Sequence, residues 1–256
     1  MDKVASLTGQ ERSDIFRYTA DQMNLASPII EKDFWVCWTL KHLFGHPTLG
    51  SDLIFKGGTT LSKVYNVIQR FSEDIDISIS RSLLGFDGER DPGNPELSVK
   101  KRRKLLEDMG KACSEYVCGR MKDDIETLFT EIIGKPGESW SVQVYDEDPD
   151  RQTLLFNYPS SEDRLDYIKP YVRIECGCRS DFWPIEKAVI TPYLVDHVPQ
   201  AFENADCGVT VLSAGRTFWE KATILHQEHH RPEDKNLPDR YSRHYYDLAK
   251  TLGTHP

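Results

Sequence analysis

The sequence lacks a long hydrophobic run. No apolar stretch among its 256 residues reaches the roughly 18 residues that a membrane-spanning helix requires. No apolar signal segment follows residues 1–5, so we expect neither secretion nor a membrane partner. With an ordinary 39% of hydrophobic residues, these absences predict a folded, cytoplasmic protein of one large domain or two small ones.

Paired cysteine motifs are also absent. The six cysteines are scattered, and none belongs to the CxxC pairs that structural zinc sites use. Cys176 and Cys178 lie closest together. Reduced thiols of a cytosolic protein explain this pair better than a metal or redox site does.

Basic side chains are in the minority. Lys and Arg total 32 against 41 Asp and Glu, which gives a net charge of -9. This balance argues against a protein that coats nucleic acid in general, although it allows a local basic groove. The basic run at residues 100–104 is more typical of a solvated helix face than of an RNA-binding edge.

Hydrophobic periodicity predicts an α/β body in residues 1–210 and a helical C-terminal region in residues 211–256. Helices are predicted at residues 9–24, 27–45, 59–67, 98–133, 215–230 and 238–252, with Ser27 as a cap and Pro28 at the first helical position of the second. Strands are predicted at residues 52–56, 75–79 and 171–176, and a hairpin or meander within 134–170. A loop is predicted at 81–98, and a loop with a short strand within 191–208. The fold class is therefore α/β, of the α+β kind, with a mixed sheet flanked by helices.

A double glycine links a predicted strand to a predicted helix. Gly57 and Gly58 allow an unusual backbone path, and N–H groups at a helix start attract phosphate oxygens. The hydroxyls of Thr59 and Thr60 either cap this helix or contact the same phosphate. An isolated Gly-Gly turn is common and more often structural. The candidate nucleotide-binding residues here are Lys56, Gly57, Gly58, Thr59, Thr60 and Lys63.

Two aspartates lie two residues apart on the next predicted strand. Asp74 and Asp76 point to the same face of that strand, while the intervening isoleucines point to the core. Neighbouring carboxylates repel each other unless a cation lies between them, and oxygen ligands suit Mg²⁺. An exposed acidic strand end is the alternative for this pair taken alone.

A third carboxylate is expected on an adjacent strand. Glu175 fits, because it shares a strand face with Arg173 while the apolar neighbours face the other way. Asp166 and Asp181 are alternatives at less strand-like positions. A glycine turn, one helix and then an acidic strand form the arrangement that phosphoryl transfer requires: the turn holds a triphosphate and the carboxylates hold its metal ions.

These motifs resemble the DNA polymerase β-type nucleotidyltransferase superfamily. The details resemble one branch of it, the AbiEii/AbiGii abortive-infection toxin family, which includes the MenT-type toxins. The stretches that carry the resemblance are residues 30–36 (IEKDFWV), 55–61 (FKGGTTL), 70–76 (RFSEDID), 218–222 (FWEKA) and 243–248 (RHYYDL).

The resemblance implies a nucleotidyltransferase sheet and metal-dependent transfer from a nucleoside triphosphate. It implies that Asp74 and Asp76 bind Mg²⁺ or Mn²⁺ and that Gly57 and Gly58 grip the triphosphate. Our assignment adds Glu175 as a third metal ligand and catalytic residue. By the same resemblance, the acceptor is RNA, at the 3′ end of tRNA, and the protein is the toxin of a pair with a cognate antitoxin.

Two further residues receive roles from the resemblance. Lys221 is expected to contact the nucleotide, and both Lys221 and Asp247 are expected to be catalytic. Without the resemblance, an ordinary ion pair between Arg243 and Asp247 on a helix surface is the better explanation. Two functional alternatives stay open: nucleotidylation of a protein or small molecule, and a non-catalytic nucleotide-binding module.

Overall fold

A single mixed sheet forms the centre of the molecule. The computed structural model describes residues 1–256 except 138, 164, 166, 181, 233–240 and 255–256. The strands are β1 (Leu53–Lys56), β2 (Ile75–Ile79), β3 (Ser141–Val144), β4 (Thr153–Asn157), β5 (Val172–Gly177), β6 (Ile185–Ile190) and β7 (Cys207–Leu212). Their order is β3-β4-β5-β2-β1-β7-β6, with β2 parallel to β5 and β1 parallel to β7. The predicted α+β class is confirmed.

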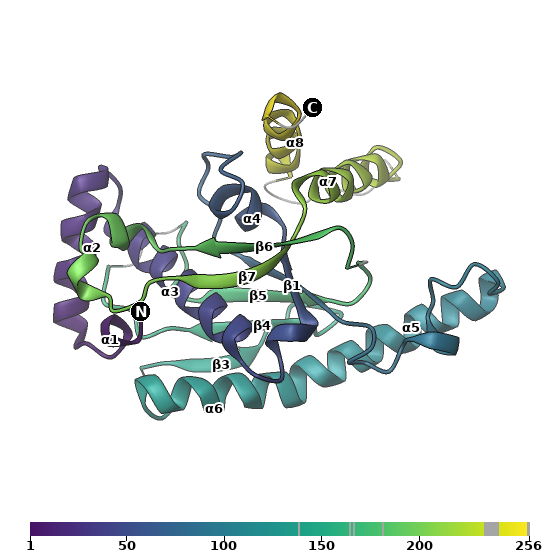
Figure 1. Ribbon diagram of the computed structural model, residues 1–256, viewed down its shortest axis with the longest axis horizontal. Coiled ribbons are helices and arrows are strands. Elements are labelled where there is room, and N and C mark those ends of the chain that lie inside the picture. Colours follow the sequence, from purple (N-terminus) through teal and green to yellow (C-terminus); the bar gives the residue numbers. More distant parts are fainter. Residues whose placement is uncertain (138, 164, 166, 181, 233–240, 255–256) are drawn as a thin grey trace.

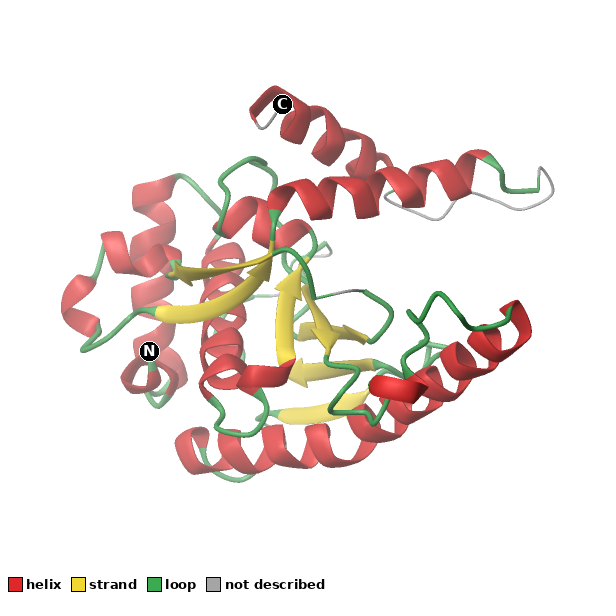
Figure 2. Cartoon of the chain, turned by 45° about the vertical axis from the view of Figure 1, so that its right-hand side comes forward, coloured by secondary structure: helices red, strands yellow, loops and turns green. Residues whose placement is uncertain are grey.

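Helices surround this sheet (Figures 1 and 2). They are α1 (Asp2–Ala5), α2 (Gly9–Met23), α3 (Ser27–Gly45), α4 (Gly58–Lys63), α5 (Val99–Tyr116), α6 (Lys122–Ile133), α7 (Ala214–His229) and α8 (Ser242–Thr254). Helix α6 follows the β3 edge, whereas α7 and α8 pack on each other away from α1 and α2. No helix in the described ranges is long and apolar enough to cross a membrane.

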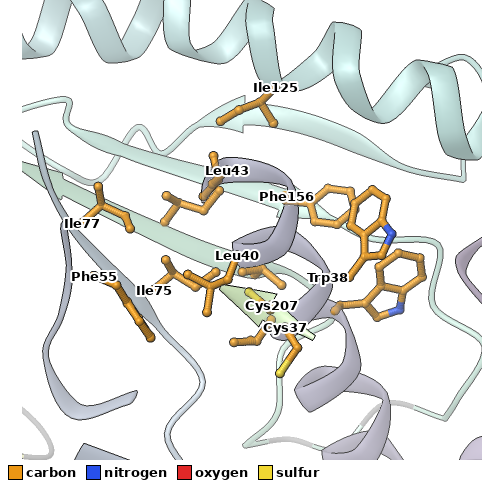
Figure 3. Packing of buried hydrophobic residues seen from close by; sticks show 14 of the residues in the cluster. Cys37, Trp38, Leu40, Leu43, Phe55, Ile75, Ile77, Ile125, Phe156 and Cys207 are labelled. Atoms are coloured by element: carbon orange, nitrogen blue, oxygen red, sulfur yellow. The ribbon is translucent and has the colours of Figure 1, made fainter. Parts of the chain in front are cut away.

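The core forms between the sheet and α3. Ile75 and Ile77 of β2 are fully buried, as their alternation with polar residues predicts. Helix α3 is buried over most of its surface and is correspondingly rich in aromatic and aliphatic residues. Figure 3 shows Trp38 of α3 beside Phe156 of β4, with ring centroids 5.8 Å apart. This packing fixes the strands whose ends carry the candidate site.

Several predicted boundaries are wrong for local reasons. Ala26, not Ser27, caps α3, and Pro28 lies within the first turn. Helix α4 ends at Lys63 instead of residue 67, because the chain turns through a left-handed backbone at Asn66. The predicted helical stretch at 98–133 is confirmed, as α5 and α6 joined by a π-helical turn at Val117–Met121.

Two strands near the C-terminal half were not predicted as such. Strand β6 is an edge strand with mostly exposed side chains, so it has no clear alternation of buried and exposed positions. Strand β7 extends to Leu212, so the helical region begins at Ala214 and the proposed boundary at residue 210 falls inside a strand.

Candidate active site

A pocket of about 280 Å³ lies where β1 ends and β2 begins, beside α7 and α8. The residues that line it are Lys56, Gly57, Gly58, Arg70, Ser72, Asp74, Asp76, Glu175, Thr217, Glu220, Lys221, Ile224, Arg243 and His244. Most of the predicted site residues therefore meet in one place. Thr59, Thr60, Lys63 and Asp247 are not in the lining.

Strand register brings the three carboxylates together. Asp76 of β2 pairs with Lys56 of the antiparallel β1 on one side. On the other side it pairs with Glu175 of the parallel β5. Asp74 directly precedes Ile75, the first residue of β2. The expected position of Glu175, on a strand adjacent to the aspartates, is thus confirmed, whereas the alternatives Asp166 and Asp181 lie outside the described residues.

Gly57 is required by the geometry of the turn. Its backbone has φ +84°, a conformation that side chains with a Cβ rarely adopt. A Cβ at this position would also overlap the Asp76 carboxylate. At Gly58, a Cβ would lie 2.9 Å from an Arg70 nitrogen. The two glycines therefore let Asp76 and Arg70 approach the backbone of the turn.

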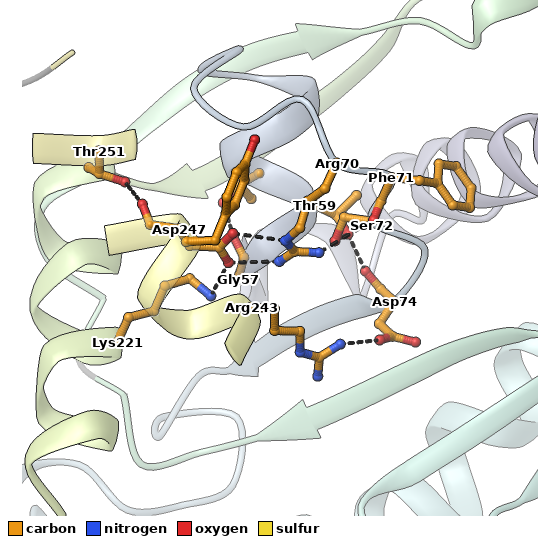
Figure 4. A network of polar contacts seen from close by, with 12 residues as sticks. Gly57, Thr59, Arg70, Phe71, Ser72, Asp74, Lys221, Arg243, Asp247 and Thr251 are labelled. Carbon is orange, nitrogen blue, oxygen red and sulfur yellow. Dashed lines mark hydrogen bonds and ion pairs between the residues drawn. The ribbon is translucent and has the colours of Figure 1, made fainter. Parts of the chain in front are cut away.

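The two threonines have a structural role in place of the expected phosphate contact. The Thr59 hydroxyl donates to the Asp74 carbonyl at 2.6 Å and contacts the Ser72 hydroxyl at 3.0 Å (Figure 4). The Thr60 hydroxyl donates to the Gly57 carbonyl at 2.8 Å. Both threonines are fully buried. They hold the acidic segment and the glycine turn in place from behind.

Lys63 also departs from its expected role. Its ammonium forms an ion pair with Asp33 of α3 and donates to the Thr191 carbonyl at 3.2 Å. It lies 3.7 Å from the centroid of the Tyr193 ring. Burial alone would lower the pKa of Lys63, but the Asp33 carboxylate outweighs it and the pKa is raised. Lys63 thus anchors α4 to α3 and does not reach the pocket.

The acidic side of the pocket carries more charge than its own partners neutralise. Burial and then the charges of Glu175 and Asp74 raise the pKa of Asp76 to about 7. Burial and the charge of Asp74 also raise the pKa of Glu175. Two arginines partly compensate: Arg173 lies 3.2 Å from Glu175, and Arg243 lies 3.8 Å from Asp74.

These oxygen donors fit a hard divalent cation. Asp74, Asp76 and Glu175 supply carboxylates only, and Mg²⁺ and Mn²⁺ prefer such ligands. A cation would relieve the repulsion that raises the pKa of Asp76. Among the described residues, no group of three or more His, Cys, Asp or Glu side chains already has the arrangement of a metal site. Mg²⁺ commonly completes its shell with water and substrate phosphates.

The opposite side of the pocket is basic. Asp247 is fully buried and accepts two hydrogen bonds from the Arg70 guanidinium, at 2.8 and 2.7 Å. It also pairs with the Lys221 ammonium at 3.0 Å (Figure 4). Burial would raise the pKa of Asp247, but the hydrogen bonds from Arg70 and the charge of Lys221 outweigh it and lower the pKa. Asp247 therefore aims two cations into the pocket while lying behind them.

Three residues of the pocket lining belong to the motifs that carry the family resemblance, but they received no functional role from the sequence. Arg70 and Arg243 bring guanidinium groups to the pocket, and an arginine just before the acidic strand was the only signal for Arg70. Burial and the charges of Lys221 and Arg243 lower the pKa of His244 to about 4, so its imidazole is neutral near pH 7.

A mixed sheet that presents carboxylates and a glycine turn to one pocket, opposite a cluster of cations, defines the nucleotidyltransferase class. The family model of the nucleotidyl transferase AbiEii toxin, of type IV toxin–antitoxin systems, matches residues 38–256. The match covers most of the chain, and the chain belongs to this family, as the sequence motifs indicated. It is a nucleotidyltransferase and a toxin of the type IV class. A search of curated proteins finds no match.

Proposed function

We propose that the pocket transfers a nucleotide from a nucleoside triphosphate to an RNA acceptor, with the 3′ end of tRNA as the target. The observation that carries this proposal is the register of Asp76 with Glu175, next to a glycine turn that can approach a phosphate closely. Acidic and basic groups then face each other across one pocket. In phosphoryl transfer, cationic groups stabilise the negative charge of the phosphates, and carboxylates can hold the metal ions that assist them.

The basic side receives the triphosphate. Arg70 offers a planar guanidinium and Lys221 a compact ammonium, and both suit phosphate oxygens. Asp247 is a positioning residue in this scheme, because its carboxylate holds Arg70 and Lys221 and does not line the pocket. Lys56 lies at the end of β1 beside Asp76 and completes the positive charge. Gly57 and Gly58 contribute close backbone approach, while Thr59, Thr60 and Lys63 hold the turn and its helix from outside the pocket.

The acidic side carries the chemistry. Asp74, Asp76 and Glu175 would hold Mg²⁺ or Mn²⁺, which neutralises phosphate charge when it is bound. The acceptor hydroxyl attacks the α-phosphorus in line, a new oxygen–phosphorus bond forms, and the bond to the β-phosphate oxygen breaks to release pyrophosphate. Glu175 helps to position the acceptor hydroxyl and to accept its proton.

A label-transfer assay tests the proposal. The purified protein is incubated with each labelled nucleoside triphosphate, Mg²⁺ and total tRNA, beside an Asp76→Asn variant. We expect label on RNA from one nucleotide and none with the variant. A label that survives ribonuclease would indicate that the acceptor is a protein and not RNA. Nucleotide binding without transfer to any acceptor would contradict catalysis by this pocket.

A further inference from the structure

A second groove, of about 490 Å³, lies beside the candidate active site. Helix α7 separates the two: Lys221 lines the active-site pocket, whereas Arg216 and Trp219 line the second groove. Lys56, Glu220 and Ile224 line both. The described residues of the second groove are Lys56, Arg179, Ser180, Arg216, Trp219, Glu220, Thr223, Ile224 and Gln227.

The second groove carries an exposed indole. Trp219 is 67% exposed although it stands on a well-formed helix. Phe218 meets it edge-to-face, with ring centroids 5.4 Å apart and planes at 82°. This contact supports the ring and leaves most of its surface open. An open, supported aromatic ring is the platform on which an unpaired nucleobase stacks.

Charge in the second groove differs from charge in the whole chain. Lys56, Arg179 and Arg216 are basic, and Glu220 is the single acid among the described lining residues. The whole chain has 32 basic and 41 acidic residues. Glu220 is occupied by Lys56 at 3.3 Å and lies 3.9 Å from Arg216. The groove therefore offers net positive charge beside the indole, which suits a sugar–phosphate backbone.

The second groove opens at the reacting groups. Lys56 pairs with Asp76 in the strand register, and its ammonium donates to the Ser180 hydroxyl at 2.7 Å. A chain that lies along the groove therefore ends beside the carboxylates. The donor triphosphate is assigned to Arg70 and Lys221, on the other face of α7, so the second groove is available to a second substrate.

We propose that the second groove binds the unpaired 3′-terminal nucleotides of the acceptor RNA. Trp219 stacks a base, and Arg179 and Arg216 contact the phosphates on either side. This inference rests on the proposed function and adds the means by which the acceptor hydroxyl is held in place. Ser180, Thr223 and Gln227 supply neutral hydrogen-bonding groups that tolerate different base edges.

Binding without turnover tests the inference. The full-length protein is titrated into a fluorescein-labelled, unstructured RNA of about 12 nucleotides with a free 3′ hydroxyl, without nucleoside triphosphate. We expect Trp219→Ala to weaken RNA binding roughly ten- to hundred-fold and Trp219→Phe to restore most of it. Tyr18→Ala is the matched control: this aromatic side chain is 51% exposed on α2, far from α7 (Figure 1).

Four further measurements separate the groove from the catalytic pocket. Trp219→Ala should keep its Tm and its nucleoside triphosphate affinity and should raise KM for RNA. Arg179→Gln should reduce the slope of log affinity against log salt by about 0.7, as expected for one lost phosphate contact. Unchanged RNA affinity in Trp219→Ala, or a loss of triphosphate affinity in its place, overturns the inference.

Failure of the proposed function gives a different result. If the wild-type protein neither labels nor binds RNA, the RNA acceptor and the second groove fall together. If the wild-type protein labels and binds RNA and Trp219→Ala does so equally well, only the assignment of the groove is wrong.

Discussion

Charged side chains gather at both ends of α4, but they are balanced at one end and unbalanced at the other. At its C-terminal end, Lys63 and Asp33 form a one-to-one pair that is closed off by Thr191 and Tyr193. At its N-terminal end, Asp76 is half-buried beside Glu175 and Asp74, and its pKa is raised to about 7. A balanced buried pair holds two helices together. An unbalanced cluster keeps an unfavourable charge that a substrate or cation can relieve, which is the arrangement expected of an active site.

Removing charge from the unbalanced cluster should give the largest effect. We expect Asp76→Asn to lower the rate of nucleotide transfer by roughly 10³-fold or more, since the acidic side loses one of its three carboxylates. The unfolding free energy should stay the same or rise, because mutual repulsion is relieved. Transfer rate and urea denaturation of the same preparation measure both. A variant that loses activity only because it unfolds would contradict this view of the cluster.

Breaking the balanced pair of Lys63 and Asp33 should lower the stability and leave the activity of the folded protein unchanged. Lys63→Met leaves Asp33 buried without its partner, so we expect the unfolding free energy to fall by about 3–5 kcal/mol. The double variant Lys63→Met with Asp33→Asn should recover most of this loss, because the amide can still accept the Tyr193 N–H. Transfer per folded molecule should stay near wild type. A selective loss of triphosphate affinity would instead return Lys63 to the nucleotide site.

Gly57, which lies against Asp76, can be compared with a second glycine of similar backbone conformation. Gly57 and Gly134 share almost the same backbone, with φ of +84° and +81°, but a Cβ at Gly134 meets no atom within 4 Å. We expect Gly57→Ala and Gly134→Ala each to cost about 1–3 kcal/mol of stability from backbone strain. Only Gly57→Ala should also lose transfer activity, because its Cβ displaces Asp76. Equal activity of the two variants would show that the turn tolerates this displacement.

Local patterns in the sequence were sufficient for the acidic strand and its glycine turn. The alternation around Asp74 and Asp76 and the strand-to-helix step at Gly57 both depend on neighbouring residues only. The position of Glu175 was also correct, because an alternating strand shows which side chains share a face. Its register with Asp76 required the folded sheet, since parallel strands that are distant in sequence can pair in several ways.

Long-range burial explains the errors. Lys63 looked like a phosphate ligand because the sequence does not show that Asp33 lies across from it. The sequence suggests that Thr59 caps the helix or binds phosphate. In the structure its hydroxyl donates to the Asp74 carbonyl, because α4 packs on the acidic strand. Strand β6 was missed because an edge strand with exposed side chains has no period-two pattern. Each of these depends on partners that only the tertiary structure supplies.

The last comparison is a pH dependence confined to the unbalanced cluster. The pKa of Asp76 rises from 3.8 in the unfolded chain to about 7 in the folded one, so the native state holds the extra proton between these values. The unfolding free energy should therefore decrease as pH rises from 4 to 7, by at most about 1.4 kcal/mol per pH unit. Asp76→Asn should remove this contribution.

Added Mg²⁺ distinguishes a metal site from a carboxylate whose pKa is raised by burial and neighbouring charge alone. A cation bound by Asp74, Asp76 and Glu175 favours their charged forms, so the pKa of Asp76 should fall and the dependence on pH should become flatter. Urea denaturation across this pH range, with and without Mg²⁺, measures the change independently of activity. In Asp76→Asn the same addition should have little effect. An equally steep dependence with and without Mg²⁺ in the wild-type protein would mean that the cluster binds no cation until the nucleotide brings it.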